Sequence, residues 1–165
     1  VDGVQLVVEC VLENLAVKQQ IFRELDDISA PDGILATNTS SFLPSALASV
    51  TKRPERVLAT HYFNPAYLLP CAEVVPGPET AEEVTTAVFD LLKNVGKTPL
   101  KMAQEVVGFV ANRLQAVMYR AALSMVNRGI ATSEEIDLSV RNGFGRRLAA
   151  IGALQALDLA GWDTA

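Results

Sequence analysis

The 165-residue chain contains one histidine, His61, which lies at the end of an apolar run and is followed by Glu73 at the start of the next run. An imidazole accepts a proton near neutral pH, because its pKa in water is about 6.5. A carboxylate that binds the other ring N–H fixes the tautomer and stabilises the imidazolium, which makes the ring a better general base. Glu73 is the candidate partner, since it is the only acidic residue between His61 and Glu79. The spacing equally fits a strand-end histidine bonded to backbone and a solvated acid, so both interpretations stay open.

Further polar residues follow apolar runs that are typical of buried strands. Glu13 follows the first run, residues 38–41 (NTSS) follow the second, and residues 61–64 (HYFN) end and follow the third. Parallel sheets bind ligands beyond the carboxyl ends of their strands. We therefore expect these groups to meet at one edge of a sheet and to form an active site, although strand-end loops are polar in any protein.

Two more candidates have ordinary alternatives. Ser40 and Ser41 could contact a ligand, or they could form a turn or cap a helix that begins near Pro44. Asn112 lies in a long helical pattern, where asparagine has poor propensity, so it is either a functional residue or an ordinary exposed position. No metal site is expected, because one histidine and two distant cysteines make no recognisable ligand set.

The composition is that of a globular protein with a net charge of −5 and no block of Lys or Arg. This charge pattern argues against nucleic acid or an anionic membrane as a partner. The apolar runs are too short to span a bilayer, and the first residues lack the basic region of a signal peptide. We therefore expect a cytoplasmic protein, with an organelle matrix as the other default. Cys10 and Cys71 lie in apolar runs, which predicts small buried side chains in a reducing compartment.

Alternating strands and helices must position these residues. Apolar, β-branched runs at residues 4–11, 34–38 and 56–62 predict strands, and apolar positions at helical spacing predict a helix over residues 12–28. Strands without polar alternation, linked by helical segments, predict a parallel sheet that is covered on both faces.

The same pattern continues through the middle of the chain. It predicts a strand over residues 72–75, a helix that ends near Asn94 and a last short strand over residues 97–102. Thr80 followed by Glu83 predicts a capping box at the start of that helix.

From Val106 onward the sequence predicts helices only. One long helix is closed by Gly129, and Thr132 with Glu135 caps the next. The sequence therefore predicts an α/β fold followed by an all-α part, with domains at residues 1–103 and 104–165.

Six motifs in register resemble the 3-hydroxyacyl-CoA dehydrogenase family and span nearly all of the chain. They are VVECVLENLAVKQQIFRELD, ILATNTSS, HYFNPAYLLPCAEVV, GKTP, GFVANRL and NGFGRR. The resemblance implies the second part of a Rossmann-type parallel sheet that binds NAD, followed by a helical domain that provides substrate contacts and dimerisation.

The resemblance also implies roles for individual residues. His61 would be the general base, and Glu73 would be its orienting partner. Ser40 would contact the substrate oxygen near the nicotinamide, and Asn112 would hydrogen-bond His61 or the substrate. The residues that match family positions lining the cofactor are Glu13, Lys18 and Asn64, together with Ser40.

The implied reaction is the NAD-dependent oxidation of a 3-hydroxyacyl-CoA to the 3-ketoacyl-CoA by a homodimer, as in fatty-acid β-oxidation. The stretch NPAYLLPCAEVV also resembles relatives that oxidise small free hydroxy acids such as carnitine or gulonate. A crystallin-like scaffold without turnover is a third hypothesis. The retained set of His61, Glu73, Ser40 and Asn112 argues against that scaffold, because a scaffold has no physical need for these residues.

The chain lacks the G-x-G-x-x-G motif with which the family opens and the acidic ribose-binding residue that follows it. Both ends look cut, so we expect a fragment of a two-domain protein that binds NAD weakly and is inactive alone. The missing part would also decide between NAD and NADP. Its removal would expose a strand edge, so we expect the isolated chain to associate with itself.

Overall fold

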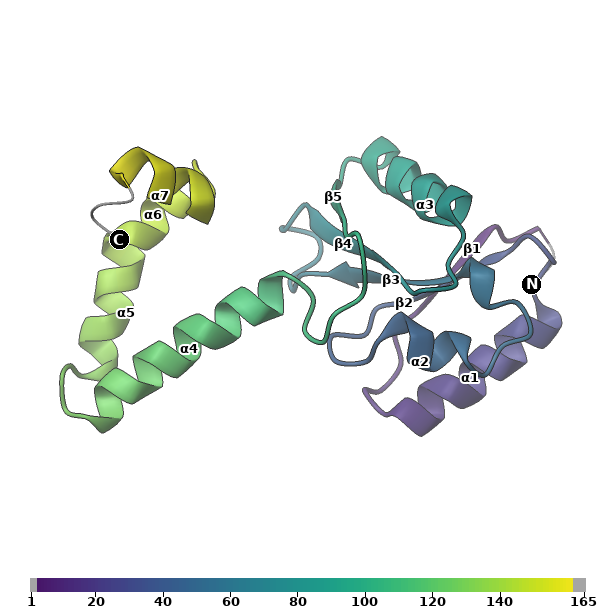
Figure 1. Cartoon of the computed structure of the whole chain (residues 1–165), viewed down its shortest axis with the longest axis horizontal. Coiled ribbons are helices and arrows are strands. Elements are labelled where there is room, and N and C mark those ends of the chain that lie inside the picture. Colours follow the sequence, from purple (N-terminus) through teal and green to yellow (C-terminus); the bar gives the residue numbers. More distant parts are fainter. Residues whose placement is uncertain (1–2, 162–165) are drawn as a thin grey trace. The chain divides into compact units, whose positions relative to one another are not determined.

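The computed structural model describes residues 3–161 and divides into two compact units, Val1–Arg113 (unit 1) and Leu114–Ala165 (unit 2). Unit 1 contains all the strands of the described chain and the helices that cover them, whereas unit 2 is helical (Figure 1). The predicted fold class, α/β followed by all-α, is therefore confirmed.

Unit 1 is built on one five-stranded sheet in the order β1-β2-β3-β4-β5. The strands are β1 (Leu6–Glu9), β2 (Ile34–Thr37), β3 (Val57–Tyr62), β4 (Cys71–Pro76) and β5 (Thr98–Lys101). The first three strands are parallel to one another, and β4 is parallel to β5. The predicted parallel sheet is thus confirmed for these pairs of strands.

Strand β4 runs antiparallel to β3. The sequence did not indicate this reversal. Only residues 63–70 connect these two strands, and they contain no helix. A parallel connection needs a crossover of about a dozen or more residues, so this short loop permits only a hairpin. The hairpin aligns the end of β3 with the start of β4.

Helices cover both faces of the sheet, because alternate strand residues point to opposite sides. The helices of unit 1 are α1 (Leu15–Ile28), α2 (Pro44–Ala48), the 3-10 turn η1 (Pro54–Arg56) and α3 (Glu82–Asn94). Leu35 and Val57 pack with Phe22 of α1 and Leu47 of α2, in one buried cluster. The alternate residues of the same strands pack against α3 in a second cluster, which includes Ala36, Leu58, Val88 and Leu92. Helices α1 and α2 thus cover one face of the sheet and α3 covers the other (Figure 1).

The predicted capping box at Thr80 and Glu83 is wrong. Helix α3 is capped by Ala81, which makes no side-chain cap hydrogen bond. Thr80 Oγ1 instead donates to the carbonyl of Val57 at 2.5 Å and accepts from the N–H of Gly77 at 2.8 Å. The Thr80 hydroxyl therefore links the residue after β4 to the start of β3 and does not cap a helix.

Unit 2 contains helices α5 (Ser133–Asn142), α6 (Phe144–Leu148) and α7 (Ala153–Ala160), together with most of α4 (Ala111–Asn127). The capping box predicted at Thr132 and Glu135 is confirmed. Gly129, at φ +66°, follows the end of α4 as predicted, because its backbone adopts the left-handed conformation that favours glycine. Within the described part of α4 to α7 no residue is buried.

The expectation that both cysteines are buried is wrong for Cys10. Cys10 is exposed, because β1 ends at Glu9 and leaves Cys10 outside the strand. Cys71 is half-buried.

Across residues 3–161, every helix is too short or too polar to cross a membrane.

Candidate functional site

The predicted site residues of unit 1 gather at the carboxyl ends of β1, β2 and β3, where the hairpin also places the start of β4. His61 and Glu73 occupy directly opposed positions on β3 and β4. Ser40 follows β2, and Glu13 follows β1. The edge that the sequence predicted to be polar therefore brings these four side chains together.

The His61 ring lies between two polar partners. Its Nδ1 is 2.7 Å from Glu73 Oε2, and its Nε2 is 3.0 Å from Ser40 Oγ. His61 is 5% exposed and Glu73 is fully buried. An ionised carboxylate can only accept hydrogen bonds, so the proton lies on Nδ1, and the lone pair of Nε2 accepts the hydroxyl of Ser40. Nε2 is thus the atom that can accept a proton from a bound hydroxyl.

The carboxylate of Glu73 is held in its ionised form by its hydrogen bonds. Burial alone would raise its pKa, but the hydrogen bond from His61 and those from the N–H groups of Ala111 and Val110 outweigh burial, so the pKa of Glu73 is lowered. The two backbone N–H groups donate to Oε1 at 3.0 and 2.9 Å. Glu73 therefore stays charged at neutral pH and can stabilise an imidazolium.

A tight turn before α4 aims these two N–H groups at Glu73. Phe109 adopts a left-handed backbone conformation, at φ +47°, which is unusual for a residue with a side chain. Its ring is almost fully buried with Ala59 and Val75, and its centroid lies 5.5 Å from that of His61. Phe63 flanks the imidazole at 5.3 Å. Apolar rings therefore shield the His61–Glu73 pair, which the sequence did not indicate.

Ser40 and Asn112 also lie close together. The side-chain amide of Asn112 is 3.5 Å from the backbone carbonyl of Ser40, at the limit of a hydrogen bond. Ser40 itself is exposed, although its hydroxyl contacts His61. The alternative in which Ser40 or Ser41 caps a helix does not occur, because Leu43 is the N-cap of α2.

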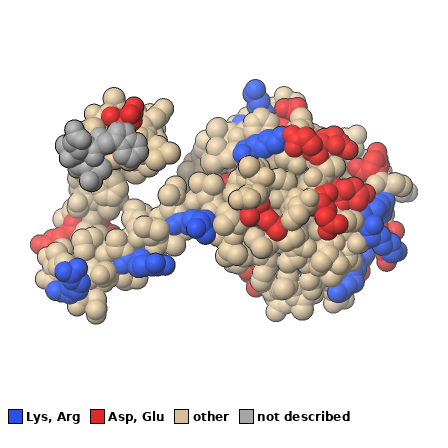
Figure 2. Space-filling view, viewed as in Figure 1, with Lys and Arg blue, Asp and Glu red and all other residues tan. Residues whose placement is uncertain are grey.

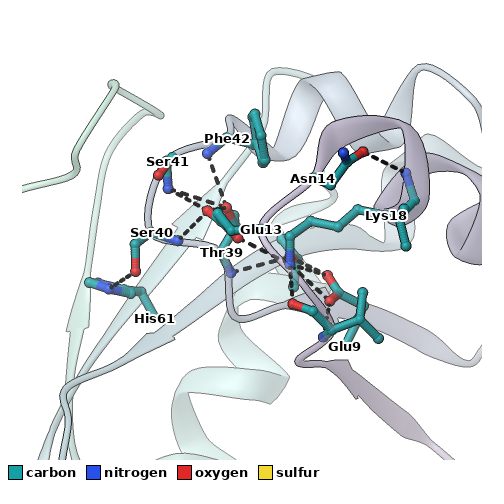
Figure 3. A network of polar contacts seen from close by, with 12 residues as sticks. Glu9, Glu13, Asn14, Lys18, Thr39, Ser40, Ser41, Phe42 and His61 are labelled. Atoms are coloured by element: carbon teal, nitrogen blue, oxygen red, sulfur yellow. Dashed lines mark hydrogen bonds and ion pairs between the residues drawn. The ribbon is translucent and has the colours of Figure 1, made fainter.

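Glu13 fastens the backbone turn that contains Ser40 (Figure 3). Its Oε1 accepts the N–H groups of Ser40 and Ser41 at 3.1 and 3.0 Å and the hydroxyl of Thr39 at 2.5 Å. Partial burial raises the pKa of Glu13, but the hydrogen bonds from Thr39 and Lys18, the charge of Lys18 and the Ser41 N–H lower it further than burial raises it. Glu13 is therefore an anion on this edge.

The remaining predicted cofactor residues differ in exposure. Asn64 is exposed after β3, where it forms a cis peptide bond with Pro65. Lys18 is only 1% exposed, and its ammonium lies 2.9 Å from Glu9 Oε1 and 3.2 Å from Glu13 Oε2. Sequence reasoning missed Glu9 as a site residue. A glutamate inside the apolar run LVVECV, nine residues before a lysine of the following helix, was the available signal.

Three polar side chains on this edge are exposed to solvent. The carboxylate of Glu13, the amide of Asn64 and the hydroxyl of Ser40 can hydrogen-bond ribose and carboxamide groups. Within residues 3–161, no cluster of three or more His, Cys, Asp or Glu side chains could hold a metal ion.

Charges of both signs lie next to one another on the face of unit 1 that Figure 2 shows. Lys52 pairs with Asp27, and Lys101 pairs with Glu82, at the surface of unit 1. Such alternation gives this face no continuous positive field.

Two family models together match nearly the whole chain. Residues 1–106 match the family model described as 3-hydroxyacyl-CoA dehydrogenase, NAD binding domain, and residues 108–165 match that of the C-terminal domain. The NAD cofactor predicted from the sequence is thereby confirmed for the type of domain that this chain contains.

Individual relatives cover nearly the whole chain. L-Carnitine dehydrogenase from Bacillus cereus is 38% identical over 99% of this chain and 50% of its own length. The human lambda-crystallin homolog is 37% identical over 96% of this chain and 50% of its own length. The crystal structure of 5-formyl-3-hydroxy-2-methylpyridine 4-carboxylic acid 5-dehydrogenase, an NAD⁺-dependent dismutase, is 34% identical and matches with a TM-score of 0.95, over 98% of this chain and 52% of that one.

The chain thus spans about half the length of the curated relatives that it matches. Both of its units match domains of one family, in the family's order. The chain therefore belongs to the 3-hydroxyacyl-CoA dehydrogenase family.

Proposed function

We propose that this chain carries the proton-transfer site of an NAD-dependent dehydrogenase that oxidises a secondary alcohol to a ketone. The observation that carries the proposal is the geometry of His61. Its Nδ1 binds the buried Glu73 at 2.7 Å, and its Nε2 faces the exposed Ser40 at 3.0 Å. A base oriented in this way has one nitrogen fixed and the other available for substrate.

Each residue of the site has a distinct task in this reaction. His61 Nε2 accepts the proton of the substrate hydroxyl, and Glu73 stabilises the imidazolium that forms. Ser40 Oγ and the amide of Asn112 hydrogen-bond the oxygen as it changes from alcohol to carbonyl. The bound NAD would supply the hydride acceptor that this oxidation requires.

Cofactor contacts are proposed for the exposed polar groups of the same edge. Glu13, Ser40 and Asn64 would bind the nicotinamide and its ribose directly. Lys18 would contribute through Glu13, because its ammonium is buried between Glu9 and Glu13. A functional boundary between residues 103 and 104 would separate this cofactor domain from the helical domain.

Two substrate classes are proposed, each with its own support. The oxidation of a 3-hydroxyacyl-CoA to the 3-ketoacyl-CoA, as in β-oxidation, is favoured by the family models. A small free hydroxy acid is favoured by the carnitine dehydrogenase relative and by the stretch NPAYLLPCAEVV. Both classes present a secondary hydroxyl near a carbonyl group, so the same proton-transfer site serves either.

An assay of the whole protein separates these classes. NADH formation is measured with 3-hydroxybutyryl-CoA and with L-carnitine, and the His61→Gln variant serves as the control. Turnover of one substrate that His61→Gln abolishes supports the proposed function and selects the class. The absence of turnover with both would favour the crystallin-like scaffold, a role consistent with the human lambda-crystallin homolog.

We also propose a cytoplasmic homodimer, with unit 2 as the contact surface. Large apolar side chains of unit 2 are exposed, including Leu114, Leu123 and Leu154 at 62, 70 and 78%. A hollow of about 300 Å³ between α4 and α5 is lined mainly by apolar side chains, among them Met118, Met125 and Ile136. Exposed apolar surface of this kind is typical of protein contacts.

A further inference from the structure

We propose that Lys18 and Glu9 form a buried ion pair that positions Ser40 and His61 through Glu13. This proposal rests on the proposed function, since it assigns a positioning role for the same proton-transfer step. Lys18 would touch neither substrate nor the reacting atoms. Its effect would pass through Glu13 and the turn of residues 39–41 (Figure 3).

The first link is the contact between Lys18 and Glu9. Both side chains are 1% exposed, and the ammonium lies 2.9 and 3.1 Å from the two carboxylate oxygens. The ammonium also donates to the carbonyl of Val11 at 3.3 Å. An isolated buried charge is costly, so the contact between the ammonium and the carboxylate offsets the cost of burying each group.

Glu9 is itself fixed from two strands. Its Oε2 accepts the hydroxyl of Thr37 at 2.8 Å, and its Oε1 accepts the N–H of Val11 at 2.5 Å. Thr37 ends β2, and Glu9 ends β1. The ammonium of Lys18 is therefore anchored to the sheet and not to a mobile surface group.

The second link joins this anchored ammonium to Glu13. The side chain of Glu13 is 39% exposed, and its Oε2 lies 3.2 Å from Lys18 Nζ. A carboxylate with this exposure would otherwise exchange among rotamers in water. Contact with an immobile buried cation restricts Glu13 to the rotamer in which its other oxygen, Oε1, faces the turn.

The third link joins Glu13 to the catalytic edge. Glu13 Oε1 accepts the N–H groups of Ser40 and Ser41, as well as the Thr39 hydroxyl. Thr39 Oγ1 in turn accepts the N–H groups of Ser41 and Phe42 at 3.2 and 3.0 Å. The turn is thus fixed by side chains, and Ser40 Oγ is held 3.0 Å from His61 Nε2. A change at Lys18 should therefore reach His61.

A purely structural role for the Lys18–Glu9 ion pair is distinguished from a positioning role by comparing a single variant with a double variant. Lys18→Met alone leaves Glu9 as an unpaired buried carboxylate, so loss of stability is expected under either account. The double variant Glu9→Gln/Lys18→Met removes both buried charges and should recover much of the stability. It does not restore the contact that orients Glu13. The double variant therefore separates folding from positioning.

Two readouts follow the variants. Isotope-labelled histidine reports on the imidazole of His61 by NMR, and the His61 signals are identified by their loss in His61→Gln. Steady-state kinetics of the whole protein gives kcat and KM for the substrate found above. Lys52→Met is the matched control, because it removes an exposed ion pair with Asp27.

We expect the folded double variant to show shifted His61 imidazole signals and a kcat lowered by about tenfold to a hundredfold. Its substrate KM should stay within about twofold, because Lys18 makes no ground-state contact with substrate. Lys52→Met should match wild type in both readouts. Glu13→Gln, at a half-exposed position that does not threaten folding, should shift the His61 signals in the same direction.

The proposal is overturned if the His61 signals stay at their wild-type positions in both the double variant and Glu13→Gln. An unchanged kcat in a folded double variant would also overturn it. If the wild-type protein turns over neither substrate, the proposed function fails, yet the NMR comparison still decides the positioning role, since it needs no turnover.

Discussion

Unit 1 and unit 2 use apolar side chains in opposite ways. In unit 1, Leu35, Leu47 and Leu58 are fully buried around the sheet, whereas in unit 2 Leu123, Leu154 and Leu159 are 70 to 78% exposed. The apolar layers of unit 1 exclude water from the His61–Glu73 pair. The hydrogen bonds and charge interactions of this pair are stronger there, because the local dielectric constant is low. The comparison shows that unit 1 encloses the His61–Glu73 pair, whereas unit 2 keeps large apolar side chains at its surface.

The largest expected change in the free energy of unfolding comes from removing a buried phenylalanine of unit 1, with an exposed phenylalanine of unit 2 as the comparison. Phe109→Ala removes a buried ring from unit 1 and should lower the free energy of unfolding by about 3–5 kcal/mol. Phe144→Ala removes a 40% exposed ring from unit 2 and should change it by less than about 1 kcal/mol. Urea denaturation measures both. Equal losses would contradict the difference between the units.

The next effect concerns the charge of Glu73. Glu73→Gln keeps an oxygen that can accept the N–H groups of Val110 and Ala111, but it cannot balance an imidazolium. We expect kcat to fall by about 10² to 10⁴-fold and the free energy of unfolding to fall by about 1–3 kcal/mol. The matched control Glu82→Gln, at an exposed carboxylate paired with Lys101, should leave both near wild type. A Glu73→Gln enzyme with wild-type kcat would show that the buried charge is not needed.

The same carboxylate gives a pH-dependent prediction. Burial raises the pKa of Glu73, but its hydrogen bonds from His61, Ala111 and Val110 lower the pKa further. Because the folded pKa is lowered, the stabilisation is complete above the unfolded value of about 4.3 and is lost as pH falls through the folded value. The difference in unfolding free energy between wild type and Glu73→Gln should shrink as pH falls below about 4. A difference that grows on acidification would reverse the assigned sign.

The smallest expected effect on stability belongs to the surface of unit 2. Leu123→Lys replaces a 70% exposed side chain and should change the free energy of unfolding by no more than about 0.5 kcal/mol. It should nevertheless weaken self-association, which light scattering after size exclusion would detect. If Leu123→Lys leaves association at the wild-type level, the homodimer contact does not involve this part of α4.

Much of unit 1 could be predicted from local patterns. The three apolar runs before Glu13, Asn38 and Asn64 indicated strands, and their polar ends indicated the functional edge, because parallel strands share that edge. The candidate pair His61 and Glu73 followed from there being no other acid nearby. These features depend on residue type and spacing alone.

Other features depend on three-dimensional context that spacing does not report. The reversal of β4 follows from the short loop, and it places His61 and Glu73 opposite each other. The left-handed backbone of Phe109 depends on its burial beside His61 and on the acceptor that Glu73 provides. The buried pair of Glu9 and Lys18 required the packing of α1 on the sheet. Thr80 matched a capping motif, yet its hydroxyl donates a hydrogen bond to the carbonyl of Val57.

The most direct test of the account is the kinetic role of His61 in the whole protein. His61→Gln is compared with wild type for alcohol oxidation, with NADH affinity measured in parallel by fluorescence. The account predicts a kcat lowered by at least about 10²-fold, with NADH affinity unchanged within about twofold. A variant that retains kcat within about threefold of wild type would contradict the assignment of His61 as the general base.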